Sequence, residues 1–179
     1  LKAGLGKRSG PGLGVVCADF TGDGWPDLFI ANDGKPNHLS VNHQGKSFTE
    51  EAVERGLAYN RMGQAQAGMG VALADVDGDG LFDLFVTHLT IEQHTLWTQG
   101  PRGLFRDRTG ESGLASPRWR GTGFGTCLAD FDHDGFPDAA VANGRVSRGP
   151  TLANPDLGPH WGLYAERNQL FVNDGKGRF

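Results

Sequence analysis

The sequence predicts an all-β chain: a segment of about three four-stranded antiparallel blades from a larger β-propeller, expected to have about seven or eight blades. Three observations predict this fold. An acidic nonapeptide recurs at a nearly constant interval, the strands around it are apolar at successive positions, and glycine is abundant while helix-type periodicity is scarce. Because a strand that is apolar at successive positions is covered on both faces, each unit needs a neighbour on either side. Radial repetition satisfies this need, and a stacked solenoid is disfavoured because its units are usually shorter.

The nonapeptide appears as DFTGDGWPD, DVDGDGLFD and DFDHDGFPD, at residues 19–27, 75–83 and 130–138. The first aspartates of successive copies are 56 and 55 residues apart. The flanks repeat as well: GLGVVCAD, GMGVALAD and GFGTCLAD precede the copies, and LFIAN, LFVTH and AAVAN follow them. Self-similarity at a fixed period of this length is typical of repeat architectures.

The repeat divides the chain into blades that each read as strand, acidic loop, strand, turn, strand, glycine turn and strand. LKAGL at the start resembles the later endings VERGL and GESGL, and is therefore expected to be the tail of a preceding repeat. The expected units are residues 1–11 (this tail), 12–67, 68–122 and 123–179, the last with a long inserted loop at 144–167 and a truncated end. About three blades cannot close a ring, so the first expected partners are the remaining blades, from the same polypeptide or another chain, and this piece alone is expected to be poorly stable.

The acidic loops have the chemistry of calcium sites. Two like charges about 4 Å apart repel by about 4 kcal/mol at an effective dielectric of 20, so converging carboxylates favour a bound cation. Calcium suits an all-protein oxygen cage better than magnesium, which keeps several waters. The spacing matches the start of an EF-hand, but position 12 of the second copy is Val86, inside an apolar strand, where an EF-hand needs Glu. The alternative of metal-free Asx turns is disfavoured because three copies align.

Gly-(Phe/Met/Leu)-Gly before an Ala-Asp strand, followed by D-x-(D/T)-x-D-G-x-x-D, resembles the FG-GAP (VCBS-type) repeats of the integrin α-chain propeller. NQLFVNDGKGRF and the later Gly-Leu-Ala endings resemble bacterial repeat proteins that carry an ASPIC/UnbV domain. The resemblance implies about three calcium ions, one per repeat, bound by the side chains at loop positions 1, 3, 5 and 9 and the carbonyl at position 7. The implied ligands are Asp19, Thr21, Asp23, Trp25 and Asp27; Asp75, Asp77, Asp79, Leu81 and Asp83; and Asp130, Asp132, Asp134, Phe136 and Asp138. Thr21 carries less charge than aspartate, so the first site is expected to be the weakest.

The distribution of charged and apolar residues argues against two classes of function, nucleic-acid binding and membrane insertion. Of the 21 acidic residues, 11 lie in the three loops, whereas the 17 basic residues are scattered, which does not favour nucleic-acid binding. No apolar run is long enough to cross a membrane, so direct membrane insertion is not expected. Cys17 and Cys127 are expected to be buried free thiols on opposite faces of equivalent strands.

No catalytic constellation stands out, so the chain is not expected to be an enzyme. The aspartate pairs could imitate a glycosidase dyad, but metal ligation explains their spacing. The six histidines show no zinc spacing, and His88 and His94 are expected to be a solvated pair. The predicted function is a calcium-binding, non-enzymatic adhesion, binding or scaffold module outside the cytoplasm, secreted, at the cell surface or periplasmic. The alternative is an accessory propeller domain or subunit of a secreted enzyme or redox assembly.

A protein or glycan ligand is expected on the face opposite the acidic loops. The loop between Asp138 and Asn168 spans 30 residues, against ten between Asp27 and Asn37, and long loops rich in proline, glycine and aromatic residues are often functional. The predicted contact residues are Arg118, Trp119 and Arg120 in a linker, and Arg145, Arg148, His160, Trp161 and Tyr164 in this loop. The alternative is that the two tryptophans only pack the loop against the disc.

Overall fold

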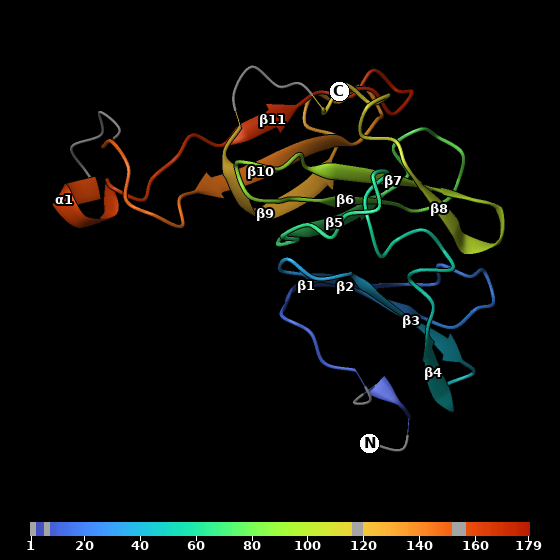
Figure 1. The fold of residues 1–179 in the computed structure, drawn as a ribbon. Coiled ribbons are helices and arrows are strands. Elements are labelled where there is room, and N and C mark those ends of the chain that lie inside the picture. Colours follow the sequence, from blue (N-terminus) through green and yellow to red (C-terminus); the bar gives the residue numbers. More distant parts are fainter. Residues whose placement is uncertain (1–2, 6–7, 116–119, 152–156) are drawn as a thin grey trace.

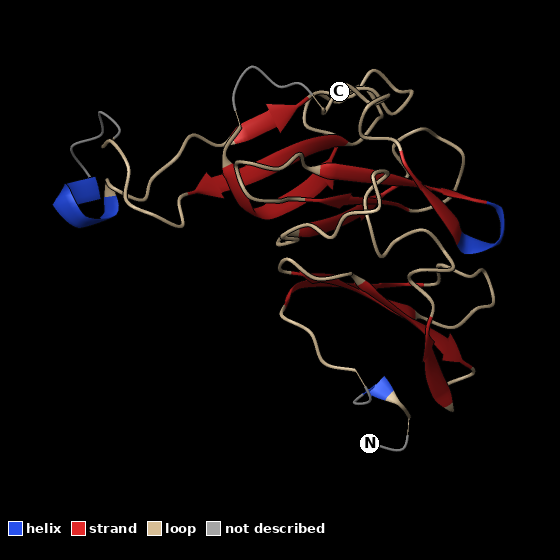
Figure 2. Ribbon diagram, viewed as in Figure 1, coloured by secondary structure: helices blue, strands red, loops and turns tan. Residues whose placement is uncertain are grey.

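The computed structural model describes residues 3–5, 8–115, 120–151 and 157–179, and strands dominate it (Figure 2). Three antiparallel sheets follow one another along the chain, which confirms the predicted nearly all-β fold. We call these sheets blades 1, 2 and 3. No helix of the described part is long and apolar enough to cross a membrane.

Each blade is a meander whose strands are neighbours in chain order. Blade 1 contains β1 (Gly12–Ala18), β2 (Asp27–Asn32), β3 (His38–His43) and β4 (Ser47–Glu50). Blade 2 contains β5 (Val71–Ala74), β6 (Asp83–Val86), β7 (Thr95–Gly100) and β8 (Leu104–Asp107). Blade 3 contains β9 (Thr122–Ala129), β10 (Asp138–Gly144) and β11 (Gln169–Phe171). The short helices are η2 (Pro101–Gly103) and α1 (Gly158–Trp161).

The blades stack face to face, with blade 2 between the other two (Figure 1). Their first strands, β1, β5 and β9, contact one another in that order and form the inner edge of a propeller segment. Blade 3 has three strands in the described chain, because Phe179, the counterpart of Phe48 in β4 and Phe105 in β8, is the last residue.

Two apolar clusters lie between the blades. Phe29 of blade 1 and Trp97 of blade 2 meet in the first, with ring centroids 6.4 Å apart. Phe85 and Val141 belong to the second, between blades 2 and 3. In β6, Leu84 joins the first cluster while Phe85 joins the second, because successive side chains of a strand point to opposite faces. The uninterrupted apolar run of this strand thus reflects burial on both sides.

Glycine permits the close approach of the inner strands. A Cβ atom on Gly14 would lie 2.2 Å from the Met69 carbonyl oxygen, and one on Gly70 would lie 3.0 Å from the Gly125 Cα. The equivalent Cβ on Gly125 would have only the Ala142 Cβ near it, at 4.0 Å. The second glycine of each Gly-x-Gly therefore leaves room for the inner strand of the following blade.

The fourth-strand position of each blade donates a backbone hydrogen bond to the segment at the position of the preceding tail. The Phe105 N–H donates to the Arg55 carbonyl at 2.8 Å, and the Phe179 N–H donates to the Ser112 carbonyl at 2.7 Å. Blade 1 receives the same bond at the same place, because the Phe48 N–H donates to the Ala3 carbonyl at 2.8 Å. Ala3 therefore occupies the position of a preceding repeat's tail, although the repeat boundaries themselves stay predictions.

Both cysteines are exposed, so the expectation of buried thiols was wrong. Cys17 corresponds to Leu73 in the repeat, which faces backward to the preceding blade, whereas Cys127 corresponds to Ala72, which faces forward to the following blade. Each thiol therefore lies on a blade face that no described segment covers, and their opposite orientation is as expected.

Candidate metal centres

The first aspartate of each loop orders the loop backbone. In the second loop Asp75 Oδ1 accepts the N–H groups of Gly78 and Asp79, at 2.7 and 3.1 Å, and its Oδ2 accepts the Gly80 N–H at 2.8 Å. Asp19 and Asp130 occupy the same place in the other loops, and each accepts the N–H group of its position-6 glycine. Six-residue loops are thus wound around one carboxylate.

The position-6 glycines allow this winding. Gly24, Gly80 and Gly135 have φ values of 87°, 84° and 95°, in the left-handed region that side chains disfavour. The fifth-position carboxylates stabilise the next turn: Asp23, Asp79 and Asp134 each accept the N–H of the residue two positions on, at 2.8–2.9 Å.

The last aspartate of each loop is fully buried and joins two strands to the loop. Asp83 accepts the Val76 N–H with Oδ2 and the Gln99 N–H with Oδ1, each at 2.9 Å. Asp27 accepts the corresponding bond from Asn42 in β3, and Asp138 accepts it from Asn173, two residues beyond β11. Burial raises the pKa of Asp83 to about 7 and also raises that of Asp27. A compensating positive charge would therefore be favourable here.

The third position completes a cluster of oxygens. Carboxylate oxygens of Asp75, Asp77 and Asp83 lie within 4.8 Å of one another, and Asp130, Asp132 and Asp138 form the same group in blade 3. Burial, and then the neighbouring Asp79, raises the pKa of Asp77.

The residues of the second loop fit a hard cation. Asp77 Oδ1 is shielded from solvent and accepts no hydrogen bond within the described chain. Such an orphaned carboxylate oxygen is costly unless a proton or a cation meets it. Since the other donors are carboxylates, the oxygen set suits calcium. The ion would be held by the oxygens of positions 1, 3 and 9 that the fold brings together.

Among the acidic and glycine positions of the loop, each of the other two loops departs from the second loop in one residue. Thr21 replaces the third aspartate of the first loop, and its hydroxyl lies 3.4 Å from Asp19 Oδ1, so a neutral oxygen stands where the other loops place a carboxylate. His133 replaces the glycine at position 4 and has a φ of 63°, where Gly22 and Gly78 have 75° and 78°. The third loop therefore contains strained backbone.

The long loop of blade 3 forms a finger, which we define as residues 144–151 and 157–167 (Figure 1). Arg145 bonds Glu166 and the Pro150 carbonyl, and its N–H donates to the Tyr164 carbonyl at 2.9 Å. The His160 ring lies 4.9 Å from that of Trp161, which is 67% exposed and so does not pack against the disc.

The predicted contact residues that the structure describes occupy two different local environments. Arg148 donates to the Tyr164 hydroxyl within the finger, at 3.4 Å. Arg120 instead lines a groove of about 760 Å³ between blades 1 and 2, with Glu92 and Gln66. Arg118 and Trp119 lie outside the described residues. The finger and the groove are therefore separate candidates for a partner surface.

His88 and His94 are buried, so the expectation of a solvated pair was wrong. The His88 N–H donates to His94 Nδ1 at 3.1 Å, as the Asn32 N–H donates to Asn37 Oδ1 in blade 1 and the Asn143 N–H to Asn168 Oδ1 in blade 3. Burial lowers the pKa of His88 to about 3 and that of His94 to about 4, so both are neutral. The repeat already indicated this pairing, because His88 and His94 occupy the positions of Asn32 and Asn37 in blade 1.

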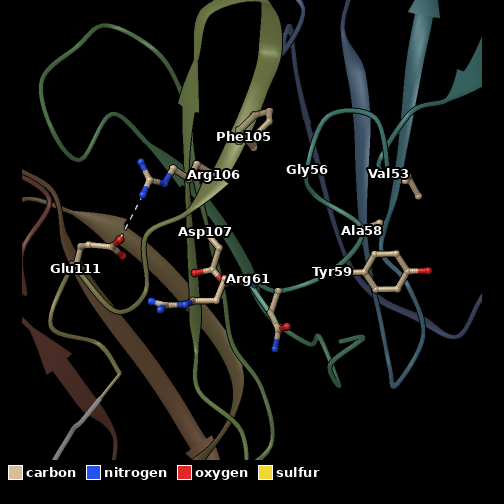
Figure 3. Close-up of a pocket in the computed structure, with 10 residues that line it drawn as sticks. Val53, Gly56, Ala58, Tyr59, Arg61, Phe105, Arg106, Asp107 and Glu111 are labelled. Carbon is tan, nitrogen blue, oxygen red and sulfur yellow. Dashed lines mark hydrogen bonds and ion pairs between the residues drawn. The ribbon is translucent and has the colours of Figure 1, made fainter. Parts of the chain in front are cut away.

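A rim pocket of about 470 Å³ lies between the tail of blade 1 and β8 (Figure 3). Arg106 Nη2 and Glu111 Oε1 lie 3.7 Å apart on one side of it (Figure 3). Both carboxylate oxygens of Asp107 are already used, by the N–H groups of Arg61 and Thr109 at 2.8 and 2.9 Å. The pocket is thus a polar joint between tail and strand and offers no catalytic pair.

Comparison with known proteins agrees with this geometry. Residues 19–86 match the FG-GAP-like repeat. The match begins at the first aspartate of the first loop and ends in β6, so it includes two acidic loops and supports the FG-GAP repeat family for this segment. Cartilage acidic protein 1 of Mus musculus is 26% identical over 144 residues, which cover 74% of this chain. The chain spans only 21% of that relative's length. Closeness to ASPIC/UnbV-associated proteins stays a prediction.

Proposed function

We propose that this chain is a calcium-stabilised propeller segment that serves as a non-enzymatic binding or scaffold module outside the cytoplasm. The buried, unpartnered Oδ1 of Asp77 inside a three-carboxylate cluster carries the proposal. A calcium ion there would offset the repulsion among the carboxylates and so fix the hairpin between β5 and β6. The repeated loops extend this role to about three ions, one per blade.

The proposed location outside the cytoplasm follows from the calcium affinity expected of the acidic loops. Few-carboxylate loops open to solvent resemble the weak calcium sites of extracellular modules, with dissociation constants of about 10⁻⁴–10⁻³ M. Such sites fill at extracellular calcium concentrations and stay empty in a cytosol. The matched FG-GAP-like repeat and the acidic loops support this setting, and the absence of a catalytic constellation in the described chain supports a binding role.

We further propose that other blades cover the outer faces of blades 1 and 3. Val15, which is 63% exposed, and Leu28 correspond to Val71 and Leu84, which pack against blade 1. On blade 3, Leu170 is 55% exposed although its counterpart Leu39 is fully buried. Each outer face thus repeats the chemistry of an internal joint.

Chelation tests the metal role. In 10 mM calcium, sites of the proposed affinity would each contribute about 1–3 kcal/mol, so about three sites raise the melting temperature by roughly 10 °C or more. A strong chelator should remove this gain and added calcium should restore it, as followed by circular dichroism. Asp77→Asn keeps the shape of a ligand but removes its charge, and should lose part of the calcium effect. Identical melting curves with and without chelator would refute the proposal.

A further inference from the structure

An amide side chain stands at the same repeat position in every blade, within β3 and β7 in blades 1 and 2 and two residues beyond β11 in blade 3. Asn42, Gln99 and Asn173 each use their backbone N–H to bond the buried last aspartate of their own loop, at 2.8–2.9 Å. Because these residues lie beside the acidic loops, their side-chain amides are close enough to form hydrogen bonds with loop atoms.

In blades 2 and 3 the side chain reaches into the loop of the preceding blade. Gln99 Nε2 donates to the Phe20 carbonyl at 3.1 Å, and Asn173 Nδ2 donates to the Val76 carbonyl at 2.9 Å. Phe20 and Val76 are equivalent residues, each at position 2 of its loop. The same bond is therefore made twice, across two different joints.

The surrounding contacts reinforce this bond. Phe20 packs edge-on against Phe105 of the next blade, with centroids 5.8 Å apart, and Val76 shares an apolar cluster with Phe179. A Cβ on Gly103 would lie 2.3 Å from the Phe20 carbonyl oxygen, so the turn of blade 2 touches the first loop directly. We call this set of contacts, an amide bond to position 2, burial of its side chain and a covering turn, the loop cover.

No described residue forms a loop cover over the third loop. Phe131, at position 2, is 47% exposed, whereas Phe20 and Val76 are fully buried. Asn42 of blade 1 makes only the bond within its own blade, because its Nδ2 donates to the Pro26 carbonyl of its own loop. Asn173 Nδ2 donates both to the Pro137 carbonyl of its own loop and to the Val76 carbonyl of the preceding blade.

We propose that each metal loop is completed by the blade that follows it, with Gln99 positioning loop 19–27 and Asn173 positioning loop 75–83. The proposal rests on calcium binding by the loops. By holding the position-2 carbonyl, the amide fixes the peptide that leads into the position-3 ligand, Thr21 or Asp77. A loop held in this way loses less conformational freedom when it binds an ion. Because coupling is reciprocal, the ion strengthens the joint by the same factor.

The burial of Gln99 supports the role of its amide nitrogen. Its Oε1 is buried and accepts no hydrogen bond within the described chain, so the oxygen costs stability. Gln99→Leu removes this cost together with the cross-blade bond. This gain offsets part of the stability lost when the Phe20 carbonyl loses its donor, so ion affinity should fall more than folding stability.

Terbium luminescence can resolve the first loop from the others. Trp25 is at position 7 of the first loop, where the other loops have Leu81 and Phe136, so excitation of tryptophan sensitises a terbium ion bound there. Trp25→Phe measures the emission from any other tryptophan. Gln99→Leu should weaken the Trp25-sensitised binding of terbium about 3- to 10-fold, as expected for one hydrogen bond. Asn173→Leu is the matched control, because it acts on the second loop and should leave this signal unchanged.

The outcomes separate the two proposals. Wild-type protein without calcium-displaceable terbium emission would refute metal binding itself. Normal wild-type emission with unchanged affinity in Gln99→Leu would overturn the cross-blade role alone. Should Gln99→Leu fail to fold, Leu81→Trp combined with Trp25→Phe moves the reporter to the second loop. There Asn173→Leu should weaken terbium binding by a similar factor, and unchanged affinity would overturn the inference equally.

Discussion

The second and third acidic loops have the same four aspartates and different surroundings. Each is wound around its first carboxylate and closed by a buried last one. Blade 3 covers the second loop, so that Val76 is fully buried, while Phe131 in the third loop remains 47% exposed. The repeat sequence therefore specifies a loop and only part of its surroundings, and the next blade supplies the rest.

The inner strands of blades 2 and 3 differ in whether a following blade packs against them. Gly70→Ala places a Cβ 2.9 Å from Thr87 Oγ1 and 3.0 Å from the Gly125 Cα, so overpacking should cost about 2 kcal/mol. Gly125→Ala, on the uncovered blade, meets its nearest atom at 4.0 Å and should change stability little. Urea unfolding of the two variants in calcium provides the measurement. Equal losses would mean that the glycine serves its own blade and not the following one.

The buried histidines are a second difference between blades 2 and 3, because blade 3 has asparagines in their places. An unfolded histidine takes up a proton below its ordinary pKa of 6.5, whereas folded His94 does so only near 4. Stability is therefore lost as pH falls, by about 2 kcal/mol at pH 5 for this residue. His94→Asn, which copies Asn37 and Asn168, should remove that share of the acid sensitivity.

Urea unfolding of wild type and His94→Asn between pH 7.5 and 5, in chelator, measures this difference. Asp83 acts in the opposite direction in metal-free protein: its raised pKa lets the folded state take up a proton first, so stability is gained as pH falls from about 7 toward 4. Because Asp83 is present in both proteins, its contribution cancels in their difference. Parallel pH profiles would contradict the burial of a neutral His94.

The smallest expected effect concerns the strained residue of the third loop. His133 has a positive φ where the other two loops have glycine, so His133→Gly should relieve roughly 1 kcal/mol of strain, partly offset by the greater freedom of glycine in the unfolded chain. Thermal melting should rise by a few degrees at most. Gly78→His in the second loop is the reverse control and should lower it.

The sequence predicted what is local and repeated. The three loops, the strands on either side of them and the blade order follow from the nonapeptide and its apolar flanks, because hairpins are specified by neighbours in the chain. The amides were also visible, in NHLSVN, HTLWTQ and NQLFVN, but their acceptors were not. Gln99 and Phe20 are 79 residues apart, and only the packing of one blade on another brings them together.

Two errors have the same physical origin. His88 and His94 were expected in solvent, because a polar residue after a strand usually lies in an exposed loop, yet the joint with neighbouring segments buries both. Cys17 and Cys127 were expected inside, because both belong to strands that a neighbouring blade would cover, yet each points to an outer face. Burial in a repeat protein depends on which neighbours are present, and a single unit does not specify them.

A crystal structure of the chain grown in calcium would show whether an ion binds in the second loop. We expect density for an ion there, within about 2.3–2.6 Å of oxygens from Asp75, Asp77 and Asp83, with Asn173 still bonded to the Val76 carbonyl. A well-ordered second loop without an ion in saturating calcium, with Asp77 turned toward solvent, would contradict this expectation.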